Sequence, residues 1–198
     1  MSVPRIGLDM LYVAKLTADS ESETTYDTSE RIFNITEAGI NFNMESETFH
    51  ADDGPAVVAS QMGDVEVTIS IGDLTPEHFA LLTGATPPAA GNKGVIDVKT
   101  SDIPPEFAVG FRSQKANGKY RYIWVMKGKF ELPNSEYQTK ADSVNFQVQE
   151  LTYRAMSRVF DSKVMRRVDS DDTNLPSMTE AQLATQWFAT PDVSPVEP

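Results

Sequence analysis

Apolar and polar residues alternate along most of this sequence, and this pattern constrains the fold more than any other feature. A period of two places the apolar side chains on one face of a β-strand. The clearest case is VEVTISI, whose apolar members are Val65, Val67, Ile69 and Ile71. Similar alternation occurs at 8–16, 40–44, 107–111, 120–127 and 144–149. The pattern predicts a mainly β protein built as an antiparallel β-sandwich or barrel.

Two short helices interrupt the strand pattern. Thr75 can cap the first helix, Pro76 suits its first turn, and Gly84 can end it in a left-handed conformation. Ser177 and Glu180 have capping-box spacing for a second helix near the C-terminal end. The apolar residues expected to dock the two helices are Phe79 and Leu82, and Leu183 and Trp187. The expected fold is therefore a sandwich with one flanking helix and a C-terminal helical segment.

The segment 120–127 is predicted to be a central strand. Asn117-Gly118 precedes it, and this dipeptide favours a tight hairpin turn. Apolar residues occupy both faces of the segment, as in strands that are covered on both sides. One face carries three aromatic residues that favour either ordinary core packing or a binding platform, namely Tyr120, Tyr122 and Trp124.

The chain divides into one large domain and a short C-terminal part. Residues 1–168 are interpreted as the β-sandwich domain, with long loops at 18–30, 45–63 and 84–105. Residues 169–198 are interpreted as an acidic linker, a short helix and a tail. A chain of 198 residues is long enough for one good-sized core.

Composition excludes several classes of chemistry. The sequence has no cysteine, which excludes disulfides and thiolate metal sites and favours folding inside a cell. No apolar run approaches the roughly 20 residues that a membrane-spanning helix requires. Polar residues break every apolar run of the N-terminal segment, so no signal peptide is predicted there.

Charge is distributed unevenly along the chain. Residues 1–111 carry 5 Lys or Arg and 18 Asp or Glu, residues 112–168 carry 12 and 5, and residues 169–198 carry 0 and 6. Such clusters can lie on solvated faces without further meaning. Alternatively, an acidic surface of one copy meets a basic surface of the next, and head-to-tail contacts of this kind build rings or filaments. The net charge of -12 argues against wrapping nucleic acid.

Two segments contain residue types that could support metal or proton-transfer chemistry. FHADDG places His50, Asp52 and Asp53 together, but no spaced ligand motif accompanies them, and Asp-Asp-Gly-Pro is typical of a turn. Residues 169–180 match part of a calcium-binding loop, yet Asn174 stands where that loop requires glycine. The sequence also lacks nucleophile-elbow and phosphate-loop motifs. We therefore expect no enzymatic activity, no metal and no cofactor.

Three segments resemble the major tail proteins of long-tailed, non-contractile phages. They are GLDMLYVAKLT (7–17), YIWVMKGKFELPNSEYQTKADSVNFQVQELTYRAM (122–156) and FHADDG. The resemblance implies a β-sandwich subunit that forms hexameric rings stacked around a tape-measure protein. Tail terminator and tail-tip proteins would be its further partners, and DNA would pass through the bore. It implies a place in the virion tail after assembly in the host cytoplasm, without membrane insertion. Residues 18–30 and 169–198 match nothing in that family.

The tube interpretation assigns two sets of site residues. A lumen wall should be polar and neutral to negative, which points to Asn41, Asn43, Glu45, Glu66, Thr68, Ser70, Asn145, Gln147 and Gln149. Contacts between subunits are predicted for the acidic residues Asp19, Glu21 and Glu23 and the basic residues Arg154, Arg158, Arg166 and Arg167. The alternative function is a soluble β-sandwich module that binds a carbohydrate or a protein partner through the aromatic face of 120–124.

Overall fold

The protein is mainly β in the computed structural model, which describes residues 3–51, 54–87, 94–133, 139, 147–172 and 179–192. The strands are β1 (Arg5–Asp19), β2 (Thr24–Tyr26), β3 (Glu30–Ile32), β4 (Ile35–Ala51), β5 (Gly54–Ile71), β6 (Glu106–Lys115), β7 (Tyr120–Phe130), β8 (Gln149–Ala155) and β9 (Met165–Asp169). The helices are α1 (Pro76–Thr83) and α2 (Glu180–Gln186). The predicted fold class is confirmed.

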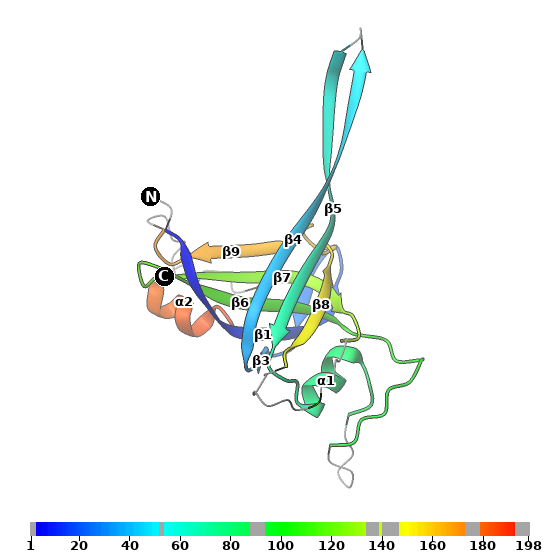
Figure 1. Ribbon diagram of the computed structural model, residues 1–198, viewed down its shortest axis with the longest axis vertical. Helices are drawn as coiled ribbons and strands as arrows, with labels where there is room; N and C mark the ends of the chain where they lie inside the picture. Colours follow the sequence, from blue (N-terminus) through cyan, green and yellow to red (C-terminus); the bar gives the residue numbers. More distant parts are fainter. Residues whose placement is uncertain are drawn as a thin grey trace.

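All strand pairs are antiparallel, in the order β2-β1-β6-β7-β8-β5-β4, with β3 added to β1 and β9 added to β7. The sheet divides at β7. The first half of this strand pairs with β9 and its last residues pair with β8. As a result, β8, β5 and β4 cross in front of the layer formed by β6, β7 and β9 (Figure 1).

Strand β7 is buried on both faces, as its sequence predicts. Ile123 and Val125 pack in the larger core, which lies between the two layers and includes Val67, Ile69 and Leu82. On its other face, α2 and the residues after it cover a second core formed by Tyr122, Trp124, Met126, Leu183, Trp187 and Phe188. Trp124 Nε1 donates a hydrogen bond to the Trp187 carbonyl oxygen at 2.9 Å, which fixes α2 to the central strand.

The first predicted helix cap is confirmed and the second is shifted. The Thr75 hydroxyl accepts a hydrogen bond from the His78 backbone N–H at 3.2 Å, and Gly84 ends α1 at φ 73°. Helix α2 is capped by Thr179, which forms a capping box with Gln182, so the predicted cap at 177 and 180 is wrong. The later Thr-x-x-Gln has the same spacing and supplies both reciprocal hydrogen bonds.

The predicted loop at 45–63 is wrong, because this segment belongs to the β4/β5 hairpin. The strands pair from Ile35 and Ile71 out to Ala51 and Gly54, so FHADDG joins β4 to β5. Of the residues in that motif, Asp52 and Asp53 lie outside the described part of the chain. The predicted loop at 18–30 contains β2 and the first residue of β3. The described residues of 84–105 form no strand beyond one isolated bridge between Thr86 and Asp97.

The predicted strand at 144–149 is displaced along the chain. Strand β8 begins at Gln149, and its buried residues are Leu151 and Tyr153. Val148, the last apolar residue of the predicted alternation at 144–149, is 58% exposed. The tertiary pairing of β8 with β5 selects the odd-numbered residues for the core, because Leu151 lies opposite Ile69.

Candidate assembly surfaces

The outer part of the β4/β5 hairpin leaves the sandwich and projects into solvent (Figure 1). We call this part, residues 43–51 and 54–63, the arm. It starts beyond the pair Phe42–Val65, where a register shift precedes the pair Met44–Met62. Its exposed large apolar side chains are Met44 (59%), Val57 (60%), Val58 (63%) and Met62 (48%). The arm therefore presents apolar surface that the described part of the same chain does not cover.

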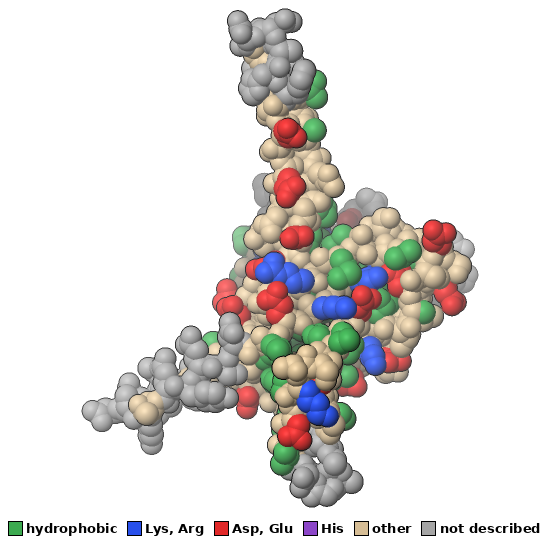
Figure 2. All heavy atoms as spheres, turned by 90° about the vertical axis from the view of Figure 1, so that its right-hand side faces the viewer, with side chains coloured by type: hydrophobic (Ala, Val, Ile, Leu, Met, Phe, Trp, Pro, Cys, Tyr) green, Lys and Arg blue, Asp and Glu red, His purple; other side chains and the backbone are tan. Residues whose placement is uncertain are grey.

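The two faces of the arm differ in chemistry. Pairing places Met44 with Met62, Ser46 with Ser60, and Thr48 with Val58. These six residues continue the core-side face of β4, and none of them is charged. The opposite face carries Glu45 beside Gln61 and Glu47 beside Ala59, and further out it carries Val57, which pairs with Phe49. Figure 2 shows acidic side chains spaced along the arm. The arm is amphipathic, with one uncharged face and one acidic face.

The outer face of β4, β5 and β8 is polar throughout its paired region. Cross-strand neighbours share a face, and the pairs here are Asn41–Glu66, Glu66–Arg154, Gly39–Thr68, Thr68–Thr152, Glu37–Ser70 and Ser70–Glu150. The residues between them on β5, including Val67 and Ile69, are fully buried. The structure thus brings Asn41, Glu66, Thr68 and Ser70 onto one polar surface.

The other residues predicted to line a lumen are scattered. Asn43 and Glu45 are exposed on the arm. Gln149 lies opposite Ile71, on the core side of β8, so its prediction as an outward residue is wrong. Gln147 is exposed and precedes the strand, and Asn145 lies outside the described residues. The shifted phase of β8 explains the error at Gln149.

Arg158 was predicted to face a neighbouring subunit and is instead buried within its own chain. It is 3% exposed and forms ion pairs with Asp161 and with Asp192, the latter at 2.6 Å. Burial opposes the charge of Arg158, but hydrogen bonds to Asp161, Asp192 and Tyr26 outweigh this effect and raise the pKa of the guanidinium. Arg158 is therefore a structural residue of the fold.

Asp19 was also predicted at a subunit contact and is also used internally. Its carboxylate accepts a hydrogen bond from Lys127 at 2.8 Å and bonds from the backbone N–H groups of Val159 and Phe160. Burial acts to raise the pKa of Asp19, yet these bonds outweigh it and lower the pKa. Both errors have one cause: a run of charges in sequence does not show which partners the fold brings to it.

The remaining predicted contact residues differ in availability. Arg154 pairs with Glu66 at 2.7 Å and Glu131 at 2.8 Å. Arg166 is half-buried, with its guanidinium 5.2 Å from the centre of the Trp187 ring, and burial lowers its pKa. Three of the predicted residues are exposed and form no ion pair within the described ranges, namely Glu21, Glu23 and Arg167.

The aromatic face of β7 is core and does not form a binding platform. Tyr122 is 1% exposed and Trp124 is fully buried beneath α2. Tyr120 is half-buried, with the Arg112 guanidinium 4.2 Å from its ring centre. A carbohydrate could not stack on this face without displacing α2.

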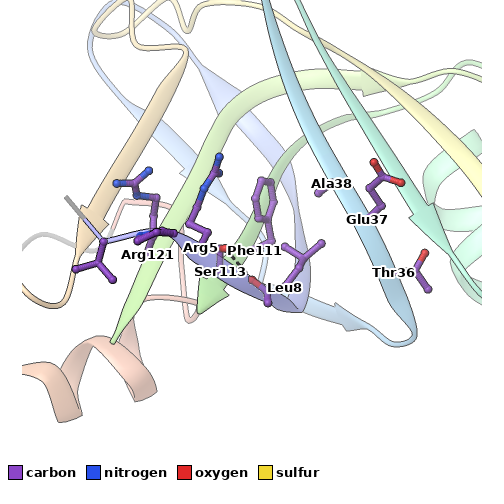
Figure 3. A pocket seen from close by; sticks show the side chains of 11 residues that line it. Arg5, Leu8, Thr36, Glu37, Ala38, Phe111, Ser113 and Arg121 are labelled. Atoms are coloured by element: carbon purple, nitrogen blue, oxygen red, sulfur yellow. Dashed lines mark hydrogen bonds between the residues drawn. The ribbon is translucent and has the colours of Figure 1, made fainter. Parts of the chain in front are cut away.

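A groove opens between the free edge of β4 and the layer of β6, β7 and β9. Figure 3 shows Thr36, Glu37 and Ala38 of β4 on one side and Arg5, Phe111 and Arg121 on the other. Two adjoining hollows of about 730 and 380 Å³ make up the groove. Both are lined by Arg5, Ala38, Phe111 and Arg121, and the smaller one also by Ile40, Phe42, Ile123, Met165 and Arg167. We call this surface the β4 groove. Sequence patterns did not reveal it, because its walls come from four distant segments.

The described residues include two carboxylates of the calcium-like segment, Asp169 and Asp171, and show what they contact. Within the described ranges, no group of three His, Cys, Asp or Glu side chains could hold a metal ion. Asp169 and Asp171, the first residues of the calcium-like loop, accept hydrogen bonds from Lys115, and Asp169 also pairs with Arg121 at 2.6 Å. A hydrogen bond from Arg121 is the largest cause that lowers the pKa of Asp169. These carboxylates serve as ion-pair partners.

A scan against models of known protein families finds no match for this chain, and a search of curated proteins finds none. Neither α1 nor α2, the two helices of the described residues, is long and apolar enough to cross a membrane.

Proposed function

We propose that this protein is a structural subunit that assembles with copies of itself into stacked rings, forming the tube of a long-tailed, non-contractile phage. The sequence resemblance suggests rings of six. In this proposal the protein is a component of the virion tail and assembles in the host cytoplasm. Its partners are its own copies, a tape-measure protein inside the tube, and terminator and tail-tip proteins at the ends. It has no enzymatic activity.

The arm is the observation that carries the proposal. Its 48–63% exposed Met and Val side chains lie on a hairpin that extends beyond the sandwich. A two-stranded hairpin without further support is marginally stable in water. Exposed apolar side chains on such an element mark a protein contact. An arm that reaches away from its own domain suits contact with another subunit better than binding of a small molecule.

The polar outer face of β4, β5 and β8 supports the same proposal as the wall of the bore. Its charged residues within the paired region are Glu37, Glu66, Glu150 and Arg154, so the acids outnumber the bases. A wall of this kind would let DNA pass, because phosphates bind strongly to basic surfaces and weakly to acidic ones. The paired region of this face also carries no large apolar side chain that could bind a molecule moving through the bore.

Removal of the arm tests the proposal. A variant in which Asn-Gly replaces residues 43–63 keeps every pair of the sandwich, so it should fold as a monomer. Concentrated wild-type protein should form rings or tubes in negative-stain electron microscopy, and the variant should form none. A matched control is Ala181→Ser with Ala184→Ser on the exposed face of α2, which should leave assembly unchanged. Wild-type protein that stays monomeric, or an armless variant that forms normal tubes, would contradict the proposal.

A further inference from the structure

We infer that the β4 groove is the receptor for the arm of a second copy of this chain. The inference rests on the proposed function, and it adds which surface receives the arm. Three properties support it: an apolar floor beside an unpaired strand edge, unpaired cations at the rim, and an arm of complementary chemistry.

The floor of the groove suits an extended apolar segment. Its accessible apolar residues are Ile40, Phe42 and Met165, of which Phe42 is 37% exposed, and the buried core residues Phe111 and Ile123 lie at its base. Among the described residues, β4 pairs with β5 alone, so within this part of the chain its other edge presents free backbone groups along the groove. An incoming strand can satisfy these groups while its side chains cover the floor.

The rim of the groove is basic. Arg5 and Arg167 are exposed and form no ion pair with any residue that the structure describes. The third cation, Arg121, is held by Asp169 at 2.6 Å. Glu37 is the acid that lines the larger hollow. The rim therefore has capacity for two further carboxylates.

The arm has the complementary chemistry. Residues 43–63 contain Glu45, Glu47, Asp52 and Asp53 and no Lys or Arg. The uncharged face, with Met44, Val58 and Met62, matches the apolar floor. Glu45 and Glu47 on the acidic face would lie within reach of the long arginine side chains at the rim. Charge complementarity of this kind selects the register of a contact.

The arm cannot occupy the groove of its own chain. Strand β4 forms one wall of the groove and continues directly into the arm, which points away from the sandwich (Figure 1). The occupant must therefore come from another copy. Because the arm and the groove are different surfaces, their contact is head-to-tail and can build closed rings or an open stack.

Cross-linking between singly substituted proteins tests the contact. The chain has no native cysteine, so each introduced thiol is the only one present. Ser60→Cys places a thiol on the uncharged face of the arm, and Ala38→Cys places one in the groove. A short bis-maleimide added to assembled mixtures should link these two variants into dimers. Ser60→Cys mixed with Ala181→Cys, on exposed α2, should give none.

Charge reversal provides the second test. Arg5→Glu with Arg167→Glu should raise the concentration needed for assembly about tenfold, because two exposed pairs become repulsive. Glu45→Arg with Glu47→Arg in the same chain should restore most of the loss. Lys15→Glu with Lys99→Glu changes the net charge equally at exposed positions outside the groove and should have little effect.

The outcomes separate this inference from the proposed function. If tubes form but Ser60→Cys and Ala38→Cys are not cross-linked, the groove is not the receptor. The same holds if Ser60→Cys links only to a second Ser60→Cys. In both cases the proposed function as a tube subunit still stands. Loss of assembly that the arm substitutions do not rescue would also overturn the groove assignment. Failure of wild-type protein to assemble would overturn both.

Discussion

Arg158 and Asp192 form an ion pair, with 2.6 Å between Nη1 and Oδ1, that ties the chain after α2 to the segment after β8. The same guanidinium binds Asp161 and lies 3.3 Å from the Tyr26 hydroxyl. Tyr26 in turn donates to the Met126 carbonyl oxygen of β7 at 2.8 Å. This cluster joins four segments that are distant in sequence.

Loss of Arg158 should destabilise the fold. Arg158→Met leaves the carboxylates of Asp161 and Asp192 without their guanidinium, and because these two side chains are 18% and 36% exposed, the cost should be about 1–3 kcal/mol. Urea unfolding should show a corresponding fall in the free energy of unfolding. Arg167→Met, at an exposed arginine, should change this value by no more than about 0.5 kcal/mol. Equal effects of the two substitutions would refute the structural role of Arg158.

Acid should weaken the same cluster. Burial acts to raise the pKa of Asp161, but hydrogen bonds from Arg158 and Lys163 outweigh it and lower the pKa from 3.8 to about 2. Because the folded pKa is the lower one, this carboxylate stabilises the fold above about pH 4, and the contribution is lost as the pH falls towards 2. The free energy of unfolding, measured from pH 6 to pH 2, should drop less steeply for Arg158→Met than for wild type. Parallel profiles would show that Asp161 does not depend on Arg158.

Gly128 should tolerate no side chain. A Cβ at this position would lie 2.2 Å from the Arg154 carbonyl oxygen and 2.6 Å from Cζ of Tyr153, whose hydroxyl donates to Phe107. Gly128→Ala should therefore cost at least about 3 kcal/mol by forcing β7 and β8 apart. Gly39→Ala is the matched control on β4, where nothing lies within 4 Å. A thermal melt that shifts equally for both variants would be incompatible with this packing.

The packing of helix α2 against the second core should depend on Trp187. Its ring packs against Tyr122, with 6.4 Å between centroids, and Trp187→Ala should cost about 3–5 kcal/mol by opening a cavity in the second core. Trp187→Phe should cost less, because Nε1 of Trp187 is buried and has no hydrogen-bond partner among the described residues. Chemical denaturation of the two variants measures the difference. A larger loss for Phe than for Ala would contradict the packing described.

The polar outer face should be shielded in an assembled tube. Thr68→Cys lies at the centre of this face and should react with a bulky maleimide in monomers but slowly in tubes. Ala181→Cys on α2 serves as the comparison, and its labelling in monomers sets the reference rate. Labelling of Thr68→Cys that is unchanged by assembly would place β4, β5 and β8 on the outside of the tube.

The sequence by itself determined the mainly β class, the first helix and the central place of β7. Val65, Val67, Ile69 and Ile71 alternate because this face of β5 is buried, with the last three in the larger core, and burial on both faces of 122–126 leaves an unbroken apolar run. The Thr75 cap and the Asn117-Gly118 turn are likewise local, since backbone geometry within a few residues specifies them.

Three features became clear only from the tertiary structure. They are the extension of the β4/β5 hairpin into the arm, the choice of β8 residues that face the core, and the ion-pair partners of the basic residues. The arm meets no core, so its strands carry no apolar alternation that could distinguish them from a loop. Arg158 forms ion pairs with Asp161 and Asp192 because folding brings their segments together, and no local sequence pattern connects these segments. Periodicity reports which side of a strand is buried, whereas ion pairs and grooves depend on contacts between distant parts of the chain, and these exist only once the chain has folded.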